Sequence, residues 1–270
     1  MRGISRASLI EVTERLEPLT ADASAATALG DELFSVAGVL ASQPVLRRAL
    51  ADPARSAEAR AGLATAVLSG KVSDGAVSVA AAIAAARWST PNDLTDATEQ
   101  LAVQAVIAAA EHEGRLDELE DELFRFGRIV AGQPALRIAL TNPFVPADAK
   151  RQLVATLLDG KAAPETVRLV TEAVANQLGR SLDLSLEEYA RLAARRRERL
   201  VAEVHVAVPL TGAQRERLAA SLARAYGHQV HLNVVLDPRV AGGMTVRVGD
   251  ELIDGSLATR LAEAGRRLAS

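Results

Sequence analysis

DELFSVAGVLASQPVLRRAL, at residues 31–50, recurs as DELFRFGRIVAGQPALRIAL at residues 121–140. The offset of 90 continues without a gap, because residues 31–88 and 121–178 share 20 identities in 58 positions. Two unrelated segments of such composition would be identical at roughly a tenth of their positions by chance. A fixed register over a long period is typical of a duplicated structural unit. We therefore expect one fold that is used twice in succession.

Within each copy, proline, serine and glycine residues mark the ends of successive helices. A Gln-Pro pair ends a long helix, and the proline can begin the short helix that follows. Ser56 can cap the next helix in the first copy, whereas Pro146 is expected at the first helical position in the second. Gly70 and Gly160 are expected to end that helix. Each copy is therefore predicted to be a bundle of about five helices with short loops, joined near residues 88–92.

One more helix is predicted before the pattern changes. Ser185 and Glu188 can form a capping box, in which each side chain accepts a hydrogen bond from the backbone of the other, so a helix should start near Leu186.

After residue 200 the hydrophobic period drops to two, which is typical of strands. Thr211 and Gln214 form a second capping box, and Gly249-Asp250 is a two-residue hairpin signal. The predicted fold is mainly α. Two tandem related helical bundles, at residues 1–92 and 93–200, precede a small α/β domain at residues 201–270 (strand-helix-strand-hairpin-helix).

Composition excludes several kinds of function. There is no cysteine, so thiol catalysis and cysteine zinc sites are excluded. The net charge of −3 and the 3% aromatic content argue against a nucleic-acid binder. The longest apolar runs are far shorter than the roughly 18 residues that a membrane span needs.

No motif supports catalysis. The Gly-Lys pairs lack the spacing of a phosphate loop, and a metal site at His228, His231 and His205 has no further ligand type fixed nearby. Asp254-Gly255-Ser256 is better explained as a turn and a helix cap than as part of a hydrolase. We predict no catalytic residue, no cofactor site and no metal site.

The C-terminal string DPRVAGGMTVRVGD, at residues 237–250, is followed by IDGS at 253–256. With LRIALTNP at residues 136–143, it makes residues 97–270 resemble the delta subunit family of F-type ATP synthases, which includes the mitochondrial oligomycin sensitivity-conferring protein. Residues 1–94 look like a duplicated N-terminal bundle, as in the long actinobacterial form of the family.

The resemblance implies a non-catalytic subunit of the peripheral stalk. Such a subunit receives the N-terminal helix of the alpha subunit on its helical domain and holds the C-terminal region of the b subunit. It resists the torque of rotation, so that proton flow stays coupled to ATP synthesis. One copy per complex is expected, at the cytoplasmic face of the cell membrane, with no nucleic acid and no membrane span of its own.

The docking groove for the alpha helix can be placed only by helix assignment. The usual Tyr-Ala start of the docking helix is replaced here by Ala102-Val103. The residues expected to line or support the groove are Val103, Val106, Ile107, Val167, Val170 and Val174. They could equally be ordinary core residues. A helical RNA-binding module of the antitermination type stays open as an alternative function, because its bundle looks similar at this level of detail.

Overall fold

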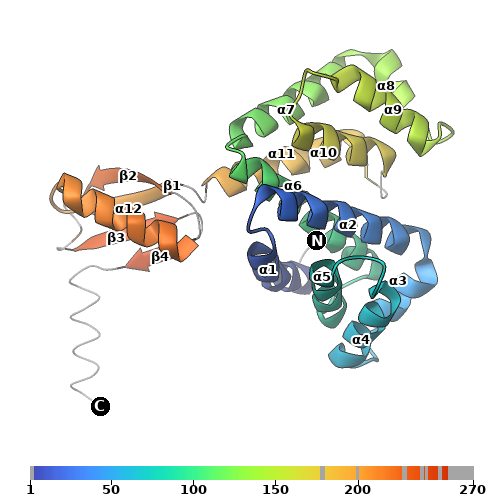
Figure 1. Cartoon of the computed structure of the whole chain (residues 1–270), viewed down its shortest axis with the longest axis horizontal. Coiled ribbons are helices and arrows are strands. Elements are labelled where there is room, and N and C mark those ends of the chain that lie inside the picture. Colours follow the sequence, from blue (N-terminus) through green and yellow to red (C-terminus); the bar gives the residue numbers. More distant parts are fainter. Residues whose placement is uncertain are drawn as a thin grey trace. The chain divides into compact units, whose positions relative to one another are not determined.

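The computed structural model describes residues 3–176, 180–198, 201–226, 230–237, 240, 243–248 and 251–254. Contacts divide the chain into two compact units, Met1–Ala193 and Ala194–Ser270 (Figure 1). The first unit is helical and the second contains a sheet, which confirms the predicted mainly α fold with a small α/β part.

The first unit is a succession of helices separated by short loops. In the described residues they are α1 (Ile4–Leu16), the 3-10 helix η1 (Glu17–Leu19), α2 (Ala23–Ser42), α3 (Pro44–Leu50), α4 (Ala57–Leu68), α5 (Asp74–Ala85), α6 (Pro91–His112), α7 (Leu116–Gly132), α8 (Pro134–Thr141), α9 (Ala147–Leu158), α10 (Pro164–Ala175) and α11 (Leu182–Glu198).

The sequence repeat is also a structural repeat. Helices α2 to α5 of the first copy recur in order as α7 to α10 of the second. The same glutamate holds the same helix start in both copies. The Glu32 carboxylate accepts hydrogen bonds from the backbone N–H and hydroxyl of Ser73 at 2.9 and 2.5 Å, just before α5. Glu122 accepts from the Ala163 N–H at 3.0 Å and the Thr166 hydroxyl at 2.5 Å, at the start of α10.

Most predicted helix ends are confirmed. Gly70 and Gly160 adopt φ angles of 72° and 61°, the left-handed conformation that a side chain disfavours. The Ser56 hydroxyl accepts a hydrogen bond from the Ala59 N–H at 3.2 Å. Pro146 stands one residue earlier than predicted, at the N-cap of α9 rather than at its first helical position.

The prediction that a helix starts near Leu186 was wrong. Helix α11 begins at Leu182, and Ser185 lies inside it and is buried. The first turn is capped by Ser181, whose hydroxyl accepts from the Leu184 N–H at 3.4 Å. The buried side chain of Leu182 explains the earlier start, because burying this apolar residue stabilises one more turn.

Helix α6 belongs to both copies. At the offset of 90 it corresponds to α11, which makes it the last helix of the first copy. It also corresponds to α1, which makes it the first helix of the second copy. It packs against α2 on one side and against α7 and α10 on the other (Figure 1). The predicted domain boundary between residues 92 and 93 falls in its first turn and stays a prediction about how the chain is organised.

The second unit is a four-stranded sheet with one described helix. Strand order is β2-β1-β3-β4, with β1 parallel to β2 and the other neighbours antiparallel. The elements are β1 (Val201–Val206), α12 (Gly212–Tyr226), β2 (His231–Leu236), β3 (Met244–Val248) and β4 (Glu251–Asp254).

One face of this sheet packs under α12. Its buried core consists of Ala202, Val204, Val206, Leu222, Val230, Val246 and Val248. The capping box at the start of α12 is confirmed, because the Thr211 N–H donates to Gln214 at 2.9 Å and the Gln214 N–H donates back to the Thr211 hydroxyl. The predicted last helix lies outside the described residues.

Candidate docking site of the helical unit

The three predicted docking residues on α6 are buried inside this chain. Val103, Val106 and Ile107 are at most 1% exposed. At Gly30 of α2, a Cβ atom would lie 2.8 Å from Cγ2 of Val106 and 3.3 Å from the carbonyl oxygen of Ala102. Since α2 lies directly on α6 here, the side of α6 that carries Val106 is covered by a helix of the first copy.

The three predicted docking residues on α10 are also largely enclosed. Val170 and Val174 are fully buried, and only Val167 keeps part of its surface. Val170 and Val174 correspond, at the offset of 90, to Ala80 and Ala84, which line a pocket inside the first bundle. The structure therefore does not bring the six residues together on an open surface, and their part in docking stays a proposal.

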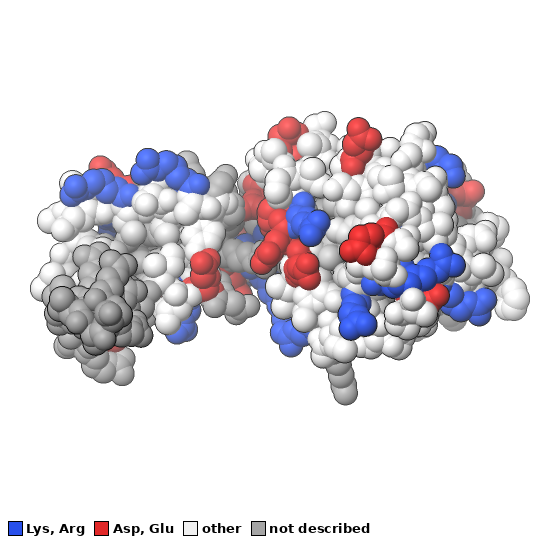
Figure 2. All heavy atoms as spheres, turned by 90° about the horizontal axis from the view of Figure 1, so that it is seen from below, with Lys and Arg blue, Asp and Glu red and all other residues white. Residues whose placement is uncertain are grey.

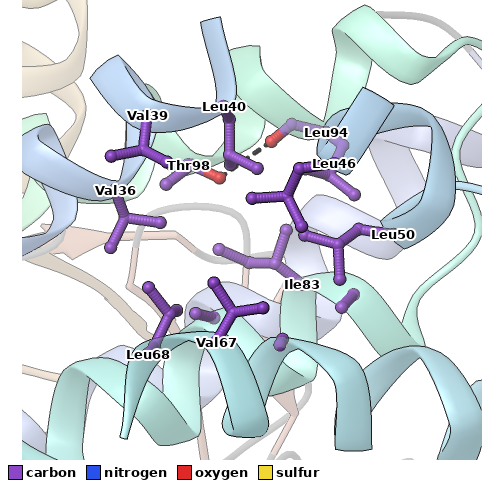
Figure 3. Close-up of a pocket in the computed structure, with 13 residues that line it drawn as sticks. Val36, Val39, Leu40, Leu46, Leu50, Val67, Leu68, Ile83, Leu94 and Thr98 are labelled. Atoms are coloured by element: carbon purple, nitrogen blue, oxygen red, sulfur yellow. Dashed lines mark hydrogen bonds between the residues drawn. The ribbon is translucent and has the colours of Figure 1, made fainter. Parts of the chain in front are cut away.

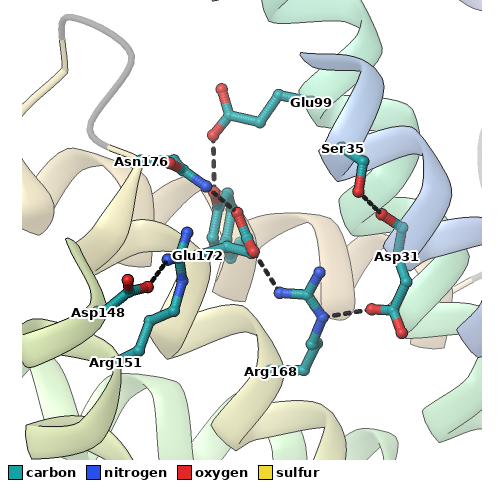
Figure 4. Close-up of polar contacts among 9 residues, drawn as sticks. Asp31, Ser35, Glu99, Asp148, Arg151, Arg168, Glu172 and Asn176 are labelled. Atoms are coloured by element: carbon teal, nitrogen blue, oxygen red, sulfur yellow. Dashed lines mark hydrogen bonds and ion pairs between the residues drawn. The ribbon is translucent and has the colours of Figure 1, made fainter. Parts of the chain in front are cut away.

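A polar seam joins α2 to α10, a feature that the sequence analysis missed. The Arg168 guanidinium donates to Asp31 on α2 and to Glu172 one turn further along α10 (Figure 4). It also lies over the Phe34 ring, with its central carbon 4.8 Å from the ring centroid. Burial works to lower the pKa of Arg168, but its hydrogen bonds to Asp31 and Glu172 outweigh that effect and raise it.

A second buried group ties α6 to α11. The Glu99 carboxylate is 4% exposed, accepts from the Tyr189 hydroxyl at 2.7 Å and pairs with Arg180. Burial raises the pKa of Glu99, although Arg180 works to lower it. Burial and the negative charge of Glu99 raise the pKa of Tyr189 well above its usual value, which keeps this hydroxyl a neutral donor.

These polar groups surround a shallow hollow that is too narrow to hold a water molecule. It is lined by Phe34, Ala37, Gly38, Glu99, Glu172, Asn176 and Tyr189. Both carboxylates that line it already have partners, since the Asn176 amide also donates to Glu172 at 2.6 Å. The seam therefore serves to hold the two copies together rather than to bind a ligand.

The first bundle contains an apolar pocket that the sequence analysis also missed. Its cavity volume is about 20 Å³, and the pocket is partly open to solvent (Figure 3). The only polar side chain that lines it is Thr98, whose hydroxyl is satisfied by the Leu94 carbonyl at 2.9 Å. Its wall is made of Val36, Val39, Leu40, Leu46, Leu50, Ala64, Val67, Leu68, Ala80, Ile83, Ala84, Leu94 and Thr98. The lining therefore offers a ligand no free polar group.

No metal centre is found in the described part of the chain, since no three His, Asp or Glu side chains there are grouped to hold an ion. Among the helices that the structure describes, none is long and apolar enough to cross a membrane. The side chains of His228, His231 and Asp254-Gly255-Ser256 lie outside the described residues.

The family model for the ATP synthase delta (OSCP) subunit matches residues 103–268, more than half of the chain. It begins inside α6, so the whole first copy up to α5 lies outside it. A chain in the cryo-EM structure of the Toxoplasma gondii mitochondrial ATP synthase hexamer aligns with 62% of this chain and 95% of its own length. Its sequence identity is 19% and its TM-score 0.32, a likeness too low to support an argument about the fold.

Full-length relatives include the first copy. ATP synthase subunit delta of Streptomyces coelicolor is 50% identical over 100% of this chain and 99% of its own length. The subunit delta of Kineococcus radiotolerans is 49% identical over 99% and 97%, and that of Thermobifida fusca is 48% identical over 100% of both chains. These matches confirm the predicted resemblance to the long actinobacterial form. The chain belongs to the ATP synthase delta (OSCP) subunit family.

Proposed function

We propose that this chain is a non-catalytic stator subunit of a proton-translocating F-type ATP synthase. It links the N-terminal helix of the alpha subunit to the C-terminal region of the b subunit. One copy acts in each complex, at the cytoplasmic face of the cell membrane. The observation that carries the proposal is the match, end to end, to subunits delta of ATP synthases at close to half identity.

The helical unit has the construction that resisting torque requires. A helix common to both copies, α6, is packed on both sides, and the contact of Arg168 with Asp31 crosses between the copies. Packed interiors have low compressibility and transmit strain. A load applied to one copy would therefore pass to the other without a flexible linker in between.

The alpha helix is expected to lie over α10 beside Val167, which is the one predicted docking residue with exposed surface. The other five are buried and would support the docking surface by fixing α6 and α10 against each other. Docking of an amphipathic helix in this way relies on apolar anchors at helical spacing.

The experiment is calorimetric titration of the full chain with a peptide of the alpha subunit N-terminus. Val167→Asp should weaken binding at least tenfold, because it places a charge in the apolar contact. Ala66→Asp, at an exposed position of α4 in the first copy, is the control and should bind like the native chain. A native chain that neither binds the peptide nor copurifies with the ATPase from membranes would contradict the proposal.

The RNA-binding alternative is not favoured by any observation. The chain carries a net charge of −3 and few aromatic residues, whereas RNA binders need a basic surface and stacking platforms.

A further inference from the structure

One side of helix α7 is exposed where the same side of α2 is covered. Asp31 and Phe34 on α2 recur at the offset of 90 as Asp121 and Phe124 on α7. The Phe34 side chain is buried, with 4% of its surface exposed, whereas Phe124 is 60% exposed. The side chains are identical and the two helices are equivalent in the repeat. The difference in exposure therefore lies in what covers them.

In the first copy the cover is an arginine that belongs to the second copy. The Arg168 guanidinium on α10 donates to Asp31, and its central carbon lies 4.8 Å from the centroid of the Phe34 ring (Figure 4). Glu172, one turn later on α10, accepts from the same guanidinium. Each copy of a tandem repeat packs on its neighbours, and the last copy has no neighbour on its outer side. The repeat occurs twice in this sequence, so Phe124 lies on that outer side.

The exposed side of α7 faces away from α10. Glu122 caps the start of α10, and Phe124 comes two residues later, which is about 200° further around the helix. The site is therefore separate from the surface of α10 beside Val167. The outer face of a terminal repeat is ordinarily polar, because no further repeat covers it. A largely exposed phenylalanine at this place favours a partner that covers it, since burial removes the ring from water.

Individual charges on α7 specify the chemistry of the partner. The face of the helical unit in Figure 2 mixes basic and acidic side chains, so no single sign of charge marks that face as a contact. On α7, by contrast, Asp121 has a counterpart in the covered contact of the first copy. Asp121 pairs with Arg125 one turn away, but both side chains are exposed, and an exposed pair contributes little to stability. Asp121 can therefore exchange Arg125 for an arginine of a partner, as Asp31 binds Arg168.

A second charge on α7 fits a glutamate on the same partner. Arg128 lies over the Phe124 ring, 5.9 Å from its centroid, and stands at the position that Gly38 has in the first copy. Gly38 and Glu172 line the same hollow. A glutamate placed like Glu172 would therefore approach Arg128, whereas in the first copy the glycine offers it no charge.

We propose that the side of α7 that carries Asp121, Phe124 and Arg128 is a docking site for a helix of a partner protein with an arginine and, four residues later, a glutamate. The arginine pairs with Asp121 and stacks on Phe124, as Arg168 does on α2. The glutamate pairs with Arg128. The comparison of the two copies carries this inference, so it does not depend on the proposed function.

The test uses disulfide tethering to the full chain, which has no cysteine of its own. Ala131→Cys places one thiol at an exposed position of α7, about two turns after Phe124 on the same side. Helical peptides of about 20 residues carry the arginine and glutamate in the middle and a cysteine at either end, in separate versions. Further peptides replace the arginine by alanine, the arginine by glutamate, or the glutamate by alanine. Mass spectrometry measures the mixed disulfide that each peptide forms at equilibrium.

The peptide with both charges should form the mixed disulfide with an equilibrium constant at least about fivefold higher than that of any other peptide. Asp121→Arg should reverse the preference between the peptides with arginine and with glutamate at the first position. Asp148→Arg makes the same change of charge at an exposed position of α9, and as the control it should leave that preference unchanged. Circular dichroism checks that both variants are folded. The proposal is overturned if all peptides tether equally, if Asp121→Arg leaves the preference unchanged, or if Asp148→Arg changes it as much.

Discussion

Replacing Gly30 by alanine tests the closest helix contact in the structure. Inside a helix, alanine is favoured over glycine by about 1 kcal/mol. At Gly30, however, the new methyl group would lie 2.8 Å from Cγ2 of Val106 and 3.3 Å from the Ala102 carbonyl oxygen. Neither neighbour can move easily, because valine has one strongly preferred rotamer in a helix and the carbonyl belongs to the backbone.

The two effects oppose each other, and the clash should win. Overpacking of a well-packed core costs about 1–3 kcal/mol. Gly30→Ala is therefore expected to lower the free energy of unfolding by about 0–2 kcal/mol after the gain in helix propensity. Gly38, in the same helix, has nothing within 4 Å of an added Cβ. Gly38→Ala should thus raise the free energy of unfolding, by about 0.5–1 kcal/mol.

Urea unfolding of both variants measures the difference between their free energies of unfolding, which is expected to be about 0.5–3 kcal/mol. Val106→Ala removes the atom that clashes, so a double-mutant cycle of Gly30→Ala with Val106→Ala should show a favourable coupling of at least about 0.5 kcal/mol. Equal stabilisation by Gly30→Ala and Gly38→Ala would refute the reasoning. It would mean that α2 does not lie directly on α6, and that the Val106 side of α6 is open to another partner.

Three further predictions concern the polar contacts between helices. Arg168→Met should lower the free energy of unfolding by about 1–3 kcal/mol, because the buried Glu172 loses its ionic partner. Arg151 forms an exposed ion pair, so Arg151→Met should change the free energy of unfolding by less than about 1 kcal/mol. Equal effects of the two substitutions in urea unfolding would contradict a stabilising role of the polar seam. Glu99 has a pKa raised above its usual 4.5, so its contribution to stability is greatest in acid and is lost as pH rises through that higher pKa. The melting temperature of the native chain should therefore fall relative to that of Glu99→Gln as the pH rises above 4.5. An unchanged difference would show that burial does not raise this pKa. Glu122→Ala should lower the free energy of unfolding by about 0.5–2 kcal/mol in urea unfolding, because it removes the cap of α10. An unchanged free energy of unfolding would mean that this cap is dispensable.

The repeat was the part of the fold that the sequence predicted best. Proline and glycine fix helix ends through their own backbone geometry, so Gly70 and Gly160 could be assigned without any tertiary information. The start of α11 was missed because Ser181 and Ser185 are both suitable caps. Burial of Leu182 decided between them, and burial is a property of the whole fold.

The sharing of α6 was not predicted, although the sequence carried a sign of it. Between residues 101 and 110, only Gln104 is polar. A helix that is apolar on every side must be buried on every side. A single bundle covers only one face of a peripheral helix, so such a segment requires a second neighbour. The predicted joint at residues 88–92 concealed the shared role of α6. A proline at the start of a helix does not indicate whether that helix is only the first of a new bundle or is also the last of the preceding one.

The buried docking candidates follow from the same fact. An apolar helix face in a sequence indicates only that something covers it, not whether the cover is another part of the chain or a partner. On α6 the cover is α2, which places Gly30 against Val106. In a family member that lacks the first copy, no α2 would be present to cover this face. The duplication therefore does more than add a second bundle. It also encloses one side of the second bundle's first helix.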